Sequence, residues 1–467
     1  MFEIKGRVRL KPGEDERIRK GHIWIYDNEI AAVKANADER AVAGERATAG
    51  AREDEGVRVG IGERVETGGR VEARDSAGRG KRGVQWGEIQ DGDLVWVEDA
   101  SGRMLGTGFA NLRSAIAVRL LTRGRREVFD GEEAMRRLSN AAARRAHLHM
   151  DCVRLVNSEG DYLPGLVIDR YGDVIVIQPG TRAWELRSDL VIDAISRVGE
   201  PRAIVLRRSP EPGRADSEHA DRGREEPAAA PQGLPAAEPG GQPPVVVRGS
   251  LQGNVTVREG GIEVEIDVLG GQKTGFYIDQ RENRASTMGH VAGRRVLDCF
   301  CYTGAWSCMC AAAGAAGVTG VDSSASALAL AATNAGRNGV AERAAFVEAD
   351  VFDYLPSMAW SREKYDVIIL DPPSLARTRK QVAGAMRGYI HINKVAMGLL
   401  GPGGILVTCS CSHHMTRERF LEMLRHCSTL VKRRVSVLRM GGQPEDHPSL
   451  LGVPETDYLK CVTLRLE

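Results

Sequence analysis

Short apolar runs and polar turns alternate along the first part of the chain. In residues 1–123, runs such as IWIYDNEI and DGDLVWVED stand between turns rich in Gly and Asp. Alternation on this short period predicts the strands of a small β-barrel. Residues 124–285 instead combine two segments of helical composition, EEAMRRLSNAAARRAHL and WELRSDLVIDAISRV, with the strand-like run GLVIDRYGDVIVIQP. We therefore expect a β-barrel followed by an α+β middle domain.

The rhythm changes again in residues 286–467. The strand-like runs RRVLDCF, GVTGVD, AAFVEAD, YDVIILDPP and GGILVTCS are separated by helical segments, which is typical of a doubly wound parallel sheet. The last two runs, RRVSVLRM and YLKCVTLRL, follow each other without an obvious crossover helix. We expect them to pair antiparallel at one edge of the sheet. The predicted fold class is α/β, with a Rossmann-like seven-stranded sheet as the third domain.

Two segments break the periodic pattern. Residues from about 35 to 85 are rich in Gly, Ala, Arg and Glu, and residues from about 209 to 244 are rich in Pro, Gly, Ala and charged residues. Such compositions have little apolar surface to bury. Strand-like runs stand on both sides of each segment, so we interpret both as insertions into domains and not as domain boundaries.

Length and composition narrow the class of protein. A chain of 467 residues is too long for one core, which predicts roughly two to four domains. Lys and Arg total 64 and Asp and Glu total 63, so a nucleic-acid partner needs a local basic patch and does not follow from net charge. No apolar run approaches the roughly 18 residues of a membrane helix, and the first residues lack the apolar stretch of a signal peptide. We expect a cytoplasmic protein with no membrane association.

The nine cysteines are expected to be free thiols, because no secretion signal is evident. Three pairs have C-x-C spacing, at 299/301, 308/310 and 409/411, so zinc is the alternative. However, Cys308 and Cys310 fall in an Ala-rich helical segment, where residues two apart are separated by roughly 200° around the axis. They cannot both face one metal. We predict small-residue packing and no metal site.

Acidic residues follow successive strands of the predicted sheet, at the edge where such sheets bind ligands. Asp298 ends the first strand, and a tight turn with Gly304 then leads into a helix, whose N-terminal N–H groups would face the ligand. The turn lacks the pattern G-x-G-x-x-G, which argues against a bound pyrophosphate. Asp322 ends the second strand, where a carboxylate suits ribose hydroxyls.

The third and fourth strand ends add two more carboxylates. Asp350 can accept a hydrogen bond from an exocyclic amine, with Val351 or Phe352 against a purine, and Asp371 opens a D-P-P turn. Strand-end acids often cap the next helix. Four in register, together with the antiparallel final strands, indicate a class I S-adenosylmethionine-dependent methyltransferase. A dehydrogenase and a domain without this cofactor are less favoured alternatives.

A thiol follows the fifth strand. Cys411 lies beside the strand end that carries Asp371, so a methyl acceptor would sit between them. Carbon 5 of a pyrimidine is a poor nucleophile, but a thiolate that adds to carbon 6 makes carbon 5 electron-rich enough to attack a sulfonium methyl. Asp371 is placed to hold or deliver a proton at ring nitrogen 3. Cys411 and Asp371 are the predicted catalytic residues, and Cys409 is interpreted as an ordinary buried thiol.

Two alternatives compete with this chemistry. Methylation of an amino group, the other use of a D-P-P turn, needs no cysteine, but such turns usually carry an aromatic residue where this chain has Ser374. Burial is the commonest fate of a cysteine, although the place of Cys411 beyond the apolar run argues against it.

Motifs spread along the chain outside the insertions are GGQKTGFYIDQRENR, LDCFCYTGAWS, DVFDYL, DPPSLARTRKQ, RGYIHINKVAMGLL, GGILVTCSCS and DHP…ETDYLK. Together they resemble those of the bacterial 23S ribosomal RNA 5-methylcytosine methyltransferases that carry an N-terminal PUA domain. The resemblance implies Cys411 as nucleophile, Asp371 as the acid, S-adenosylmethionine as cofactor and large-subunit ribosomal RNA as partner. It also implies cofactor contacts at Phe276, Tyr277, Asp279, Gln280, Asp298, Phe300, Tyr302, Thr303, Gly304, Asp322, Ser323, Asp350, Val351, Phe352, Asp371 and Pro372.

Some residues depart from the family pattern or allow two interpretations. Ser374 replaces a second cysteine that helps to expel the product in other RNA 5-methylcytosine enzymes, so product release needs another base. Phe276 and Tyr277 would wall the adenosine or the target base, with packing at a domain interface as an equal alternative for Phe276. A sister branch shares the scaffold with a different target, so the ribosomal site is an analogy.

RNA contacts are expected in two places. The segment RLKPGEDERIRKGHIWIYDNEI resembles a PUA barrel, with Lys20, His22 and Trp24 on its RNA-facing turn. The residues that follow D-P-P-S add Arg377, Arg379 and Lys380 next to the reaction site. Weaker candidates, each with a solvated or structural alternative, are the arginines of residues Arg136 to His147, Arg281, Arg284, His391 and His447.

Three functions are therefore compared. The favoured one is an RNA cytosine carbon 5 methyltransferase. The second is an RNA methyltransferase that acts on another base or amino group, in which Cys411 is incidental. The third is a non-catalytic RNA-binding or ribosome-assembly factor. A homodimer is possible for each of them.

Overall fold

The computed structural model describes residues 2–36, 84–124, 127–208, 243–358, 364–376 and 381–467. Most of both predicted insertions lies outside these residues. The chain divides into two compact units, Met1–Phe129 and Asp130–Glu467. The division between these units falls close to the predicted end of the barrel. The expected boundary at residues 285/286 instead falls inside a helix, because the middle and third domains share one core.

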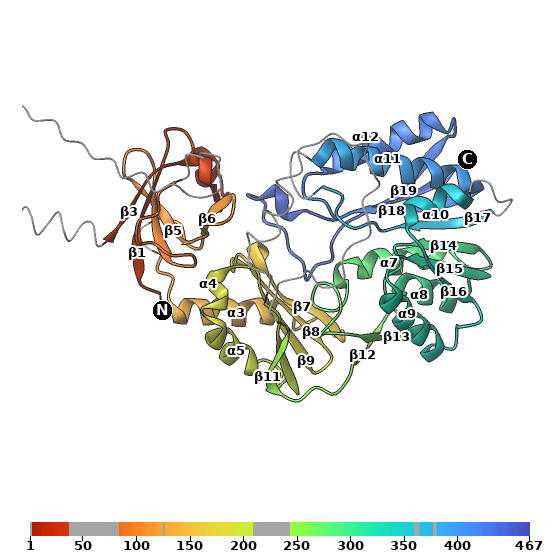
Figure 1. Ribbon diagram of the computed structural model, residues 1–467, viewed down its shortest axis with the longest axis horizontal. Helices are drawn as coiled ribbons and strands as arrows, with labels where there is room; N and C mark the ends of the chain where they lie inside the picture. The colour runs from red at the N-terminus through yellow and green to blue at the C-terminus, as the bar shows by residue number, and fades with distance from the viewer. Residues whose placement is uncertain (1, 37–83, 125–126, 209–242, 359–363, 377–380) are drawn as a thin grey trace, which may run out of the picture. The chain divides into compact units, whose positions relative to one another are not determined.

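The first unit is built on a six-stranded sheet with the order β2-β6-β5-β4-β1-β3 (Figure 1). Its strands are β1 (Ile4–Leu10), β2 (Trp24–Tyr26), β3 (Ile30–Ala35), β4 (Leu94–Glu98), β5 (Met104–Ala110) and β6 (Ile116–Leu120), with the short helix α1 (Glu16–Arg19). Strands β3 and β4 stand on either side of the first insertion, and both pair with β1. The insertion therefore interrupts one sheet and does not separate two domains.

The middle domain is a five-stranded sheet with the order β11-β10-β9-β8-β7. It comprises β7 (Cys152–Asn157), β8 (Leu166–Tyr171), β9 (Val174–Pro179), β10 (Ala203–Leu206) and β11 (Val245–Gly249), with helices α3 (Gly131–Arg144), α4 (Arg182–Glu185) and α5 (Ser188–Ser196). Strands β10 and β11 flank the second insertion and pair antiparallel with each other. The two strand-like runs predicted around this insertion are thus neighbours in one sheet.

The third domain contains the seven-stranded sheet, with the order β16-β15-β14-β17-β18-β20-β19. Its elements are β14 (Arg295–Cys299), α8 (Ala305–Ala312), β15 (Gly317–Asp322), α9 (Ala325–Arg337), β16 (Ala344–Glu348), α10 (Val351–Met358), β17 (Tyr365–Leu370), α11 (Val382–Leu399), β18 (Leu400–Ser410), α12 (Arg417–Leu430), β19 (Val435–Gly441) and β20 (Lys460–Leu466). Strand β20 runs antiparallel to both β18 and β19. The predicted α/β class and the antiparallel final pair are confirmed.

Alternate residues of the parallel strands enter two cores, one on each face of the sheet. Val296 and Ile369 belong to one core, whereas their neighbours Leu297 and Ile368 belong to the other. This is the two-residue period of a strand that is buried on both faces. Helices α10, α11 and α12 supply residues to the second core.

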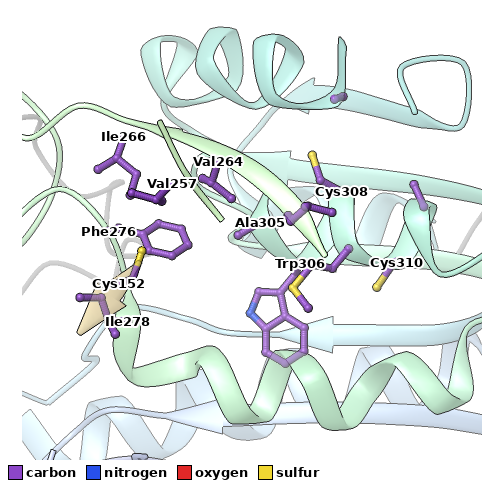
Figure 2. Packing of buried hydrophobic residues seen from close by; sticks show 14 of the residues in the cluster. Cys152, Val257, Val264, Ile266, Phe276, Ile278, Ala305, Trp306, Cys308 and Cys310 are labelled. Atoms are coloured by element: carbon purple, nitrogen blue, oxygen red, sulfur yellow. The ribbon is translucent and has the colours of Figure 1, made fainter. Parts of the chain in front are cut away.

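The first core extends into the middle domain. Cys152 of β7 lies in the same buried cluster as the hairpin β12 (Val255–Glu259) and β13 (Ile262–Ile266) and the residues of α8. Figure 2 shows Phe276 against the hairpin side chain Val257, with Cys152 and Ile278 on its other side and Cys308 and Cys310 of α8 farther away. Because apolar packing is continuous across this region, the middle and third domains form one folding unit.

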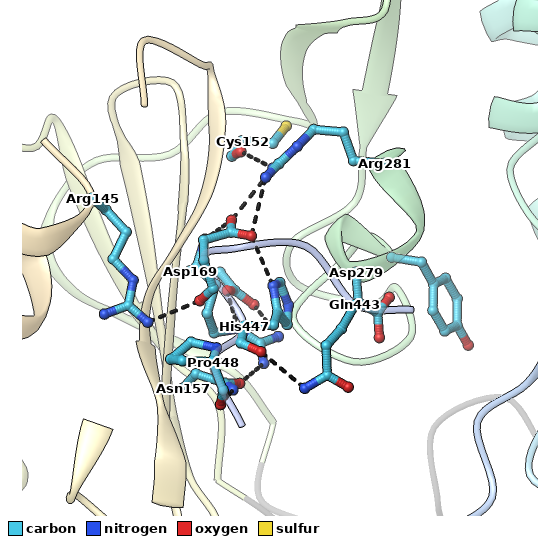
Figure 3. A network of polar contacts seen from close by, with 12 residues as sticks. Arg145, Cys152, Asn157, Asp169, Asp279, Arg281, Gln443, His447 and Pro448 are labelled. Carbon is cyan, nitrogen blue, oxygen red and sulfur yellow. Dashed lines mark hydrogen bonds and ion pairs between the residues drawn. The ribbon is translucent and has the colours of Figure 1, made fainter. Parts of the chain in front are cut away.

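A buried polar network also joins these two domains (Figure 3). Asp446, in the segment between β19 and β20, accepts from Arg281 Nη2 at 3.0 Å and from the Arg154 backbone N–H at 3.0 Å. Its backbone carbonyl accepts from Arg145 Nη2 at 2.9 Å, and Arg145 also forms an ion pair with Asp161. The segment 442–459 is therefore held on the middle sheet by charged groups that are all buried.

Burial of Asp446 would raise the pKa of its carboxyl, but the hydrogen bond from His447 and the charges of His447 and Arg281 hold the pKa well below its usual range. The carboxylate is thus the charged partner that keeps Arg281 satisfied. Among the described residues, no helix combines the length and apolar character needed to cross a membrane, and no three His, Cys, Asp or Glu side chains are grouped as metal ligands would be.

Replacement of Asp446 by alanine should destabilise the second unit strongly. Removing one partner of a buried ion pair leaves the other charge unpaired, which costs about 3–5 kcal/mol. Asp457, on the same segment, is half-exposed and pairs with Arg417 at 3.6 Å, so Asp457→Ala should cost less than about 1 kcal/mol. Urea unfolding monitored by circular dichroism checks both, and equal losses for the two variants would contradict this account.

Candidate active site

Parallel pairing brings the strand-end residues of the third domain to one edge of the sheet. Cys299 pairs with Leu370, and Leu370 pairs with Thr408. Asp298, Asp371 and Cys411 therefore lie at the ends of three neighbouring strands, as predicted. Asp322 ends β15 opposite Glu348 of β16, so the second and third acidic positions lie farther along the same edge.

The turn after β14 is strained and is held by Asp322. Phe300 and Tyr302 have φ angles of 64° and 50°, in the left-handed region that non-glycine residues rarely adopt. Asp322 Oδ2 accepts from the Tyr302 N–H at 2.9 Å, and Oδ1 accepts from the Ser324 N–H at 3.0 Å. The Ser323 N–H is also directed at this carboxylate. Asp322 thus fixes the shape of the predicted cofactor turn.

Gly304 completes this turn at the N-terminus of α8, with φ of 78°. A Cβ at this position would lie 2.9 Å from the Cβ of Ala331 and 3.2 Å from the ring of Phe346, so both the conformation and the space require glycine. Thr303 beside it is buried. The Thr303 carbonyl accepts from Asn334 Nδ2 of α9 at 3.0 Å, which holds the turn on that helix.

Asp298 is buried under the turn. Ser307 Oγ donates to its Oδ2 at 2.6 Å, whereas its Oδ1 is buried and has no hydrogen-bond partner among the described residues. Burial raises the pKa of Asp298 to about 7, and the charges of Asp371 and Asp322 add to this effect. A buried acceptor without a partner at a helix N-terminus fits a ligand that carries N–H donors or a positive charge.

The third strand end carries Asp350 and Phe352. Asp350 Oδ1 accepts from the Phe352 N–H at 2.8 Å, so it caps α10, the structural alternative for such acids. The rings of Phe352 and Phe300 are 6.1 Å apart in an edge-to-face arrangement, which places an aromatic pair between the first and third strand ends. The predicted cofactor contact of Val351 is wrong, because its side chain is buried in the core and offers no surface to an adenine ring.

The predicted ligand contact of Phe276 is also wrong. It is one of the largest buried side chains, lies in the first core, and has the guanidinium of Arg284 4.8 Å from its ring centre. The packing alternative therefore describes it, and it does not wall a ligand. Tyr277 is only partly buried, and its ring packs edge-to-face on Tyr302 at 5.4 Å, at the cofactor turn.

Asp371 is fixed by Gln280. Gln280 Nε2 donates to Asp371 Oδ1 at 2.8 Å, and Asn283 Nδ2 donates to Gln280 Oε1 at 2.7 Å, which sets the orientation of the amide. Burial raises the pKa of Asp371 to about 6, the charge of Asp279 raises it further, and the bond from Gln280 opposes the rise. A carboxyl with this pKa can take up and release a proton near neutral pH.

Cys411 differs from the other cysteines. All nine are described and none forms a disulfide, but Cys411 alone is partly exposed and the other eight are buried. Its Sγ lies 3.9 Å from the Pro372 carbonyl, in the D-P-P turn. Burial raises the pKa of its thiol to about 11; Lys273 and Lys460 lower it, and Asp371 and Asp279 raise it. Cys409 is buried beside Cys461, as expected.

Residues that the sequence analysis missed hold Cys411 in place. The hydroxyls of Ser410 and Ser412 lie 2.9 and 3.3 Å from Tyr389 OH of α11, and Ser412 Oγ is 3.0 Å from Ser374 Oγ. This cluster joins the cysteine loop to the D-P-P turn. The alternating serines of TCSCSHH and the tyrosine of RGYIHIN were the available signals.

A buried lysine provides the other support. Lys460 Nζ donates to the Ser412 carbonyl at 2.8 Å and to the Tyr458 carbonyl at 2.7 Å. Burial lowers its pKa to about 8. Lys460 pairs with Ser410 across the antiparallel strands, so only the sheet topology brings it to the cysteine loop.

Comparison with known proteins places this geometry in a family. Residues 247–446 match the family model for S-adenosylmethionine-dependent methyltransferases, and residues 8–45 and 82–123 match the PUA-like domain. The ribosomal RNA large subunit methyltransferase I of Shewanella denitrificans is 33% identical over 465 residues, which cover 98% of this chain and 99% of that protein. The same-named protein of Photobacterium profundum is 36% identical over 387 residues, 82% of this chain and 92% of that protein.

The chain belongs to the ribosomal RNA large subunit methyltransferase I family. A putative methyltransferase from Streptococcus mutans has the same fold, with a TM-score of 0.72, 17% identity, and coverage of 99% of this chain and 100% of that one. S-adenosylmethionine is the cofactor of this methyltransferase I family member. The unpartnered Asp298 Oδ1 and the turn fixed by Asp322 fit such a ligand.

Several RNA contacts expected for this methyltransferase I chain are corrected by burial. His22 is buried, with its ring nitrogen 3.1 Å from Arg17 Nη1, so it is a structural residue of its turn. Lys20 is exposed and Trp24 partly exposed, and both stay predictions. Arg377, Arg379 and Lys380 lie outside the described residues.

Four of the weaker candidates are also structural. Arg281 and Arg284 are buried in ion pairs with Asp446 and Glu259. Arg145 is buried against Asp161, and buried His447 is bonded to Asp446. His391 is exposed on α11.

Replacement of Asp322 by alanine should weaken S-adenosylmethionine binding at least about tenfold, because charge-assisted hydrogen bonds of about 1.5–3 kcal/mol each would no longer hold the strained turn. Isothermal titration calorimetry with S-adenosylhomocysteine measures the effect. Asp353→Ala, which removes an exposed carboxylate from the nearby α10, is the control and should bind normally. Unchanged affinity for Asp322→Ala would show that the turn does not form the cofactor site.

Proposed function

We propose that this protein methylates carbon 5 of a cytosine in large-subunit ribosomal RNA through a transient bond between Cys411 Sγ and carbon 6 of the base. One observation carries the proposal. Of nine cysteines, the single one that is partly exposed lies against the D-P-P turn of Asp371. A methyltransferase that modifies an amino group has no use for a thiol at this position.

The substrate class comes from two sources. The relatives that align over nearly the whole chain are named ribosomal RNA large subunit methyltransferase I. The first unit matches the PUA-like domain. Structured RNA is bound by its shape and backbone, and the base that undergoes chemistry is extruded. A chain that contains both a PUA-like unit and a methyltransferase unit fits this division of work.

The proton that the thiol releases in the addition step stays within the site. The Asp371 carboxylate accepts the thiol proton of Cys411, and the resulting thiolate adds to carbon 6. As the ring gains electrons, protonated Asp371 delivers that proton to ring nitrogen 3. S-adenosylmethionine, when bound, supplies the electrophilic methyl group. A base then removes the proton of carbon 5 and the thiolate leaves, while the proton on ring nitrogen 3 returns to Asp371 and from there to the sulfur, which restores the aromatic ring and the resting thiol.

Cys411→Ala should abolish methyl transfer, by more than about a thousandfold, and leave cofactor affinity intact, because the thiol is needed only for chemistry. Tritium from labelled cofactor is mapped onto fragmented 23S RNA for the wild type and the variant. Cys409→Ala, at the buried neighbour, is the control and should retain activity. If Cys411→Ala still methylates RNA, the covalent mechanism is wrong.

RNA substituted with 5-azacytidine gives a second readout of the same step. Nitrogen at position 5 carries no proton to eliminate after methylation, so the adduct should persist and migrate slowly in a denaturing gel. The adduct should form with the wild type and be absent with Cys411→Ala.

The pH dependence should reflect Asp371. With pKa values of about 6 for Asp371 and about 11 for Cys411, the pair rests as carboxylate and thiol between these values, and its total proton content is constant. We expect kcat/KM to be level above pH 6 and to fall about tenfold per unit below it, because a protonated Asp371 cannot accept the thiol proton. Gln280→Leu removes the bond that lowers this pKa, so its descending limb should begin at higher pH. If the acid limb of the Gln280→Leu profile does not move, that limb does not report the protonation of Asp371.

A further inference from the structure

We propose that Lys273 is a cationic group of the reaction centre. Its ammonium stabilises the Cys411 thiolate as this thiolate forms and attacks the base. The proposal rests on the proposed function, in which Cys411 is the nucleophile. Lys273 stands in the segment GGQKTGFYIDQ, where the sequence suggested only a turn. Its position combines backbone strain, a fixed side chain and a connected set of contacts that leads to both proposed catalytic residues.

The backbone at Lys273 is strained and held from two sides. Its φ is 50° and that of Gly275 is 128°, and non-glycine residues rarely adopt the left-handed region. On one side, the Gln272 N–H donates to Tyr302 OH at 2.8 Å, at the cofactor turn. On the other, Thr274 Oγ1 donates to buried Asp169 Oδ2 of β8 at 2.5 Å. Strain that the surroundings maintain in this way is characteristic of functional sites.

The side chain of Lys273 is fixed as firmly as its backbone. Nζ donates to Asp279 Oδ2 at 2.7 Å and lies 4.3 Å from the ring centre of Tyr277. Tyr458 OH donates to the same Asp279 oxygen at 2.7 Å. An ammonium has three N–H donors, and Asp279 accepts from one of them. The lysine side chain is 36% exposed, so a substrate can approach it.

A short path connects Lys273 to Cys411. Asp279, which binds Lys273, is followed by Gln280, which binds Asp371 Oδ1 at 2.8 Å. Pro372, next in the chain, has its carbonyl 3.9 Å from Cys411 Sγ. The turn of Lys273, the 3₁₀ helix η3 (Ile278–Gln280), the D-P-P turn and the cysteine loop are therefore linked by successive contacts.

Four charged side chains act on the thiol from these elements. Lys273 and Lys460 favour the thiolate, whereas Asp371 and Asp279 oppose it, and Lys273 has the largest effect of the four. Lys460 is buried and its N–H groups are directed at two carbonyls, so it holds the loop. Lys273 is the cation on the exposed side. It gains and loses no proton in the addition: the thiol proton passes to Asp371, and the sulfur–carbon bond forms beside a constant positive charge.

The alternative is that Lys273 only neutralises Asp279. Alkylation of Cys411 distinguishes the two, because Cys411 is the one cysteine that is partly exposed and iodoacetamide reacts with thiolates. Rates are measured on the full chain from pH 7 to 10, with peptide mass spectrometry to identify the labelled residue. Lys273→Met should react about tenfold more slowly at pH 8, and its profile should shift to higher pH. Lys273→Arg, which keeps the charge, should restore most of the rate.

Lys432→Met is the matched control. Lys432 also has a left-handed backbone, with φ of 55°, and is exposed after the end of α12, so this variant removes the same charge from the same conformation elsewhere. Its alkylation should match the wild type within about twofold. If Lys273→Met does not fold, Lys273→Gln replaces it, because glutamine keeps an N–H donor for Asp279 without the charge.

Methyl transfer separates this proposal from the proposed function. Lys273→Met should lower kcat about tenfold or more while KM for RNA changes little. If it alkylates and turns over like the wild type while Cys411→Ala is inactive, Lys273 has no role in the reaction and the proposed function stands. If Cys411→Ala is active, the proposed function fails, whatever the alkylation rates show.

Discussion

Buried charge pairs between the middle domain and the methyltransferase domain hold the reaction centre together. Asp446 binds Arg281 and the backbone of Arg154, and Asp169 binds Arg154 and Thr274. Asp446 is buried, so a movement of its segment away from Arg281 and Arg154 would leave charges without partners in a medium of low polarity. Such a cost is several kcal/mol per ion, which is comparable to the net stability of many domains. The segments on either side of the candidate catalytic residues therefore cannot move independently.

The left-handed residues of the site depend on this docking. Lys273, Phe300 and Tyr302 lie in two turns, and Tyr302 joins the turns by accepting from Gln272 and donating to the Gly275 carbonyl. One turn is tied to the middle sheet through Thr274 and the other to β15 through Asp322. Strain at the cofactor turn and strain at the lysine turn are thus maintained by one connected set of hydrogen bonds.

Several pKa values in the site are raised because these acidic groups are buried and are not fully neutralised by nearby cations. Asp298 and Asp371 have raised pKa values, of about 7 and about 6, because both are buried near other carboxylates. The thiol of Cys411 is also shifted upward, to about 11. With its pKa raised in this way, the thiol rests in its protonated form at neutral pH.

The sequence by itself determined the order of elements, the acids at the strand ends and the special place of Cys411, because a strand's alternation and its terminal polar residues are local properties. It also located both insertions, through composition. The sequence could not determine which of the predicted site residues are exposed. Phe276 and Val351 are in the core, and Arg281, Arg284 and His22 are buried. Only the tertiary structure decided this, since burial depends on what another segment places on top of a residue. Lys460 reaches the cysteine loop across an antiparallel pair, Asp446 reaches Arg145 from 301 positions away, and Gln280 reaches Asp371 from another domain segment. Such contacts have no periodicity in the chain, because long-range pairing is fixed by packing and not by local propensity.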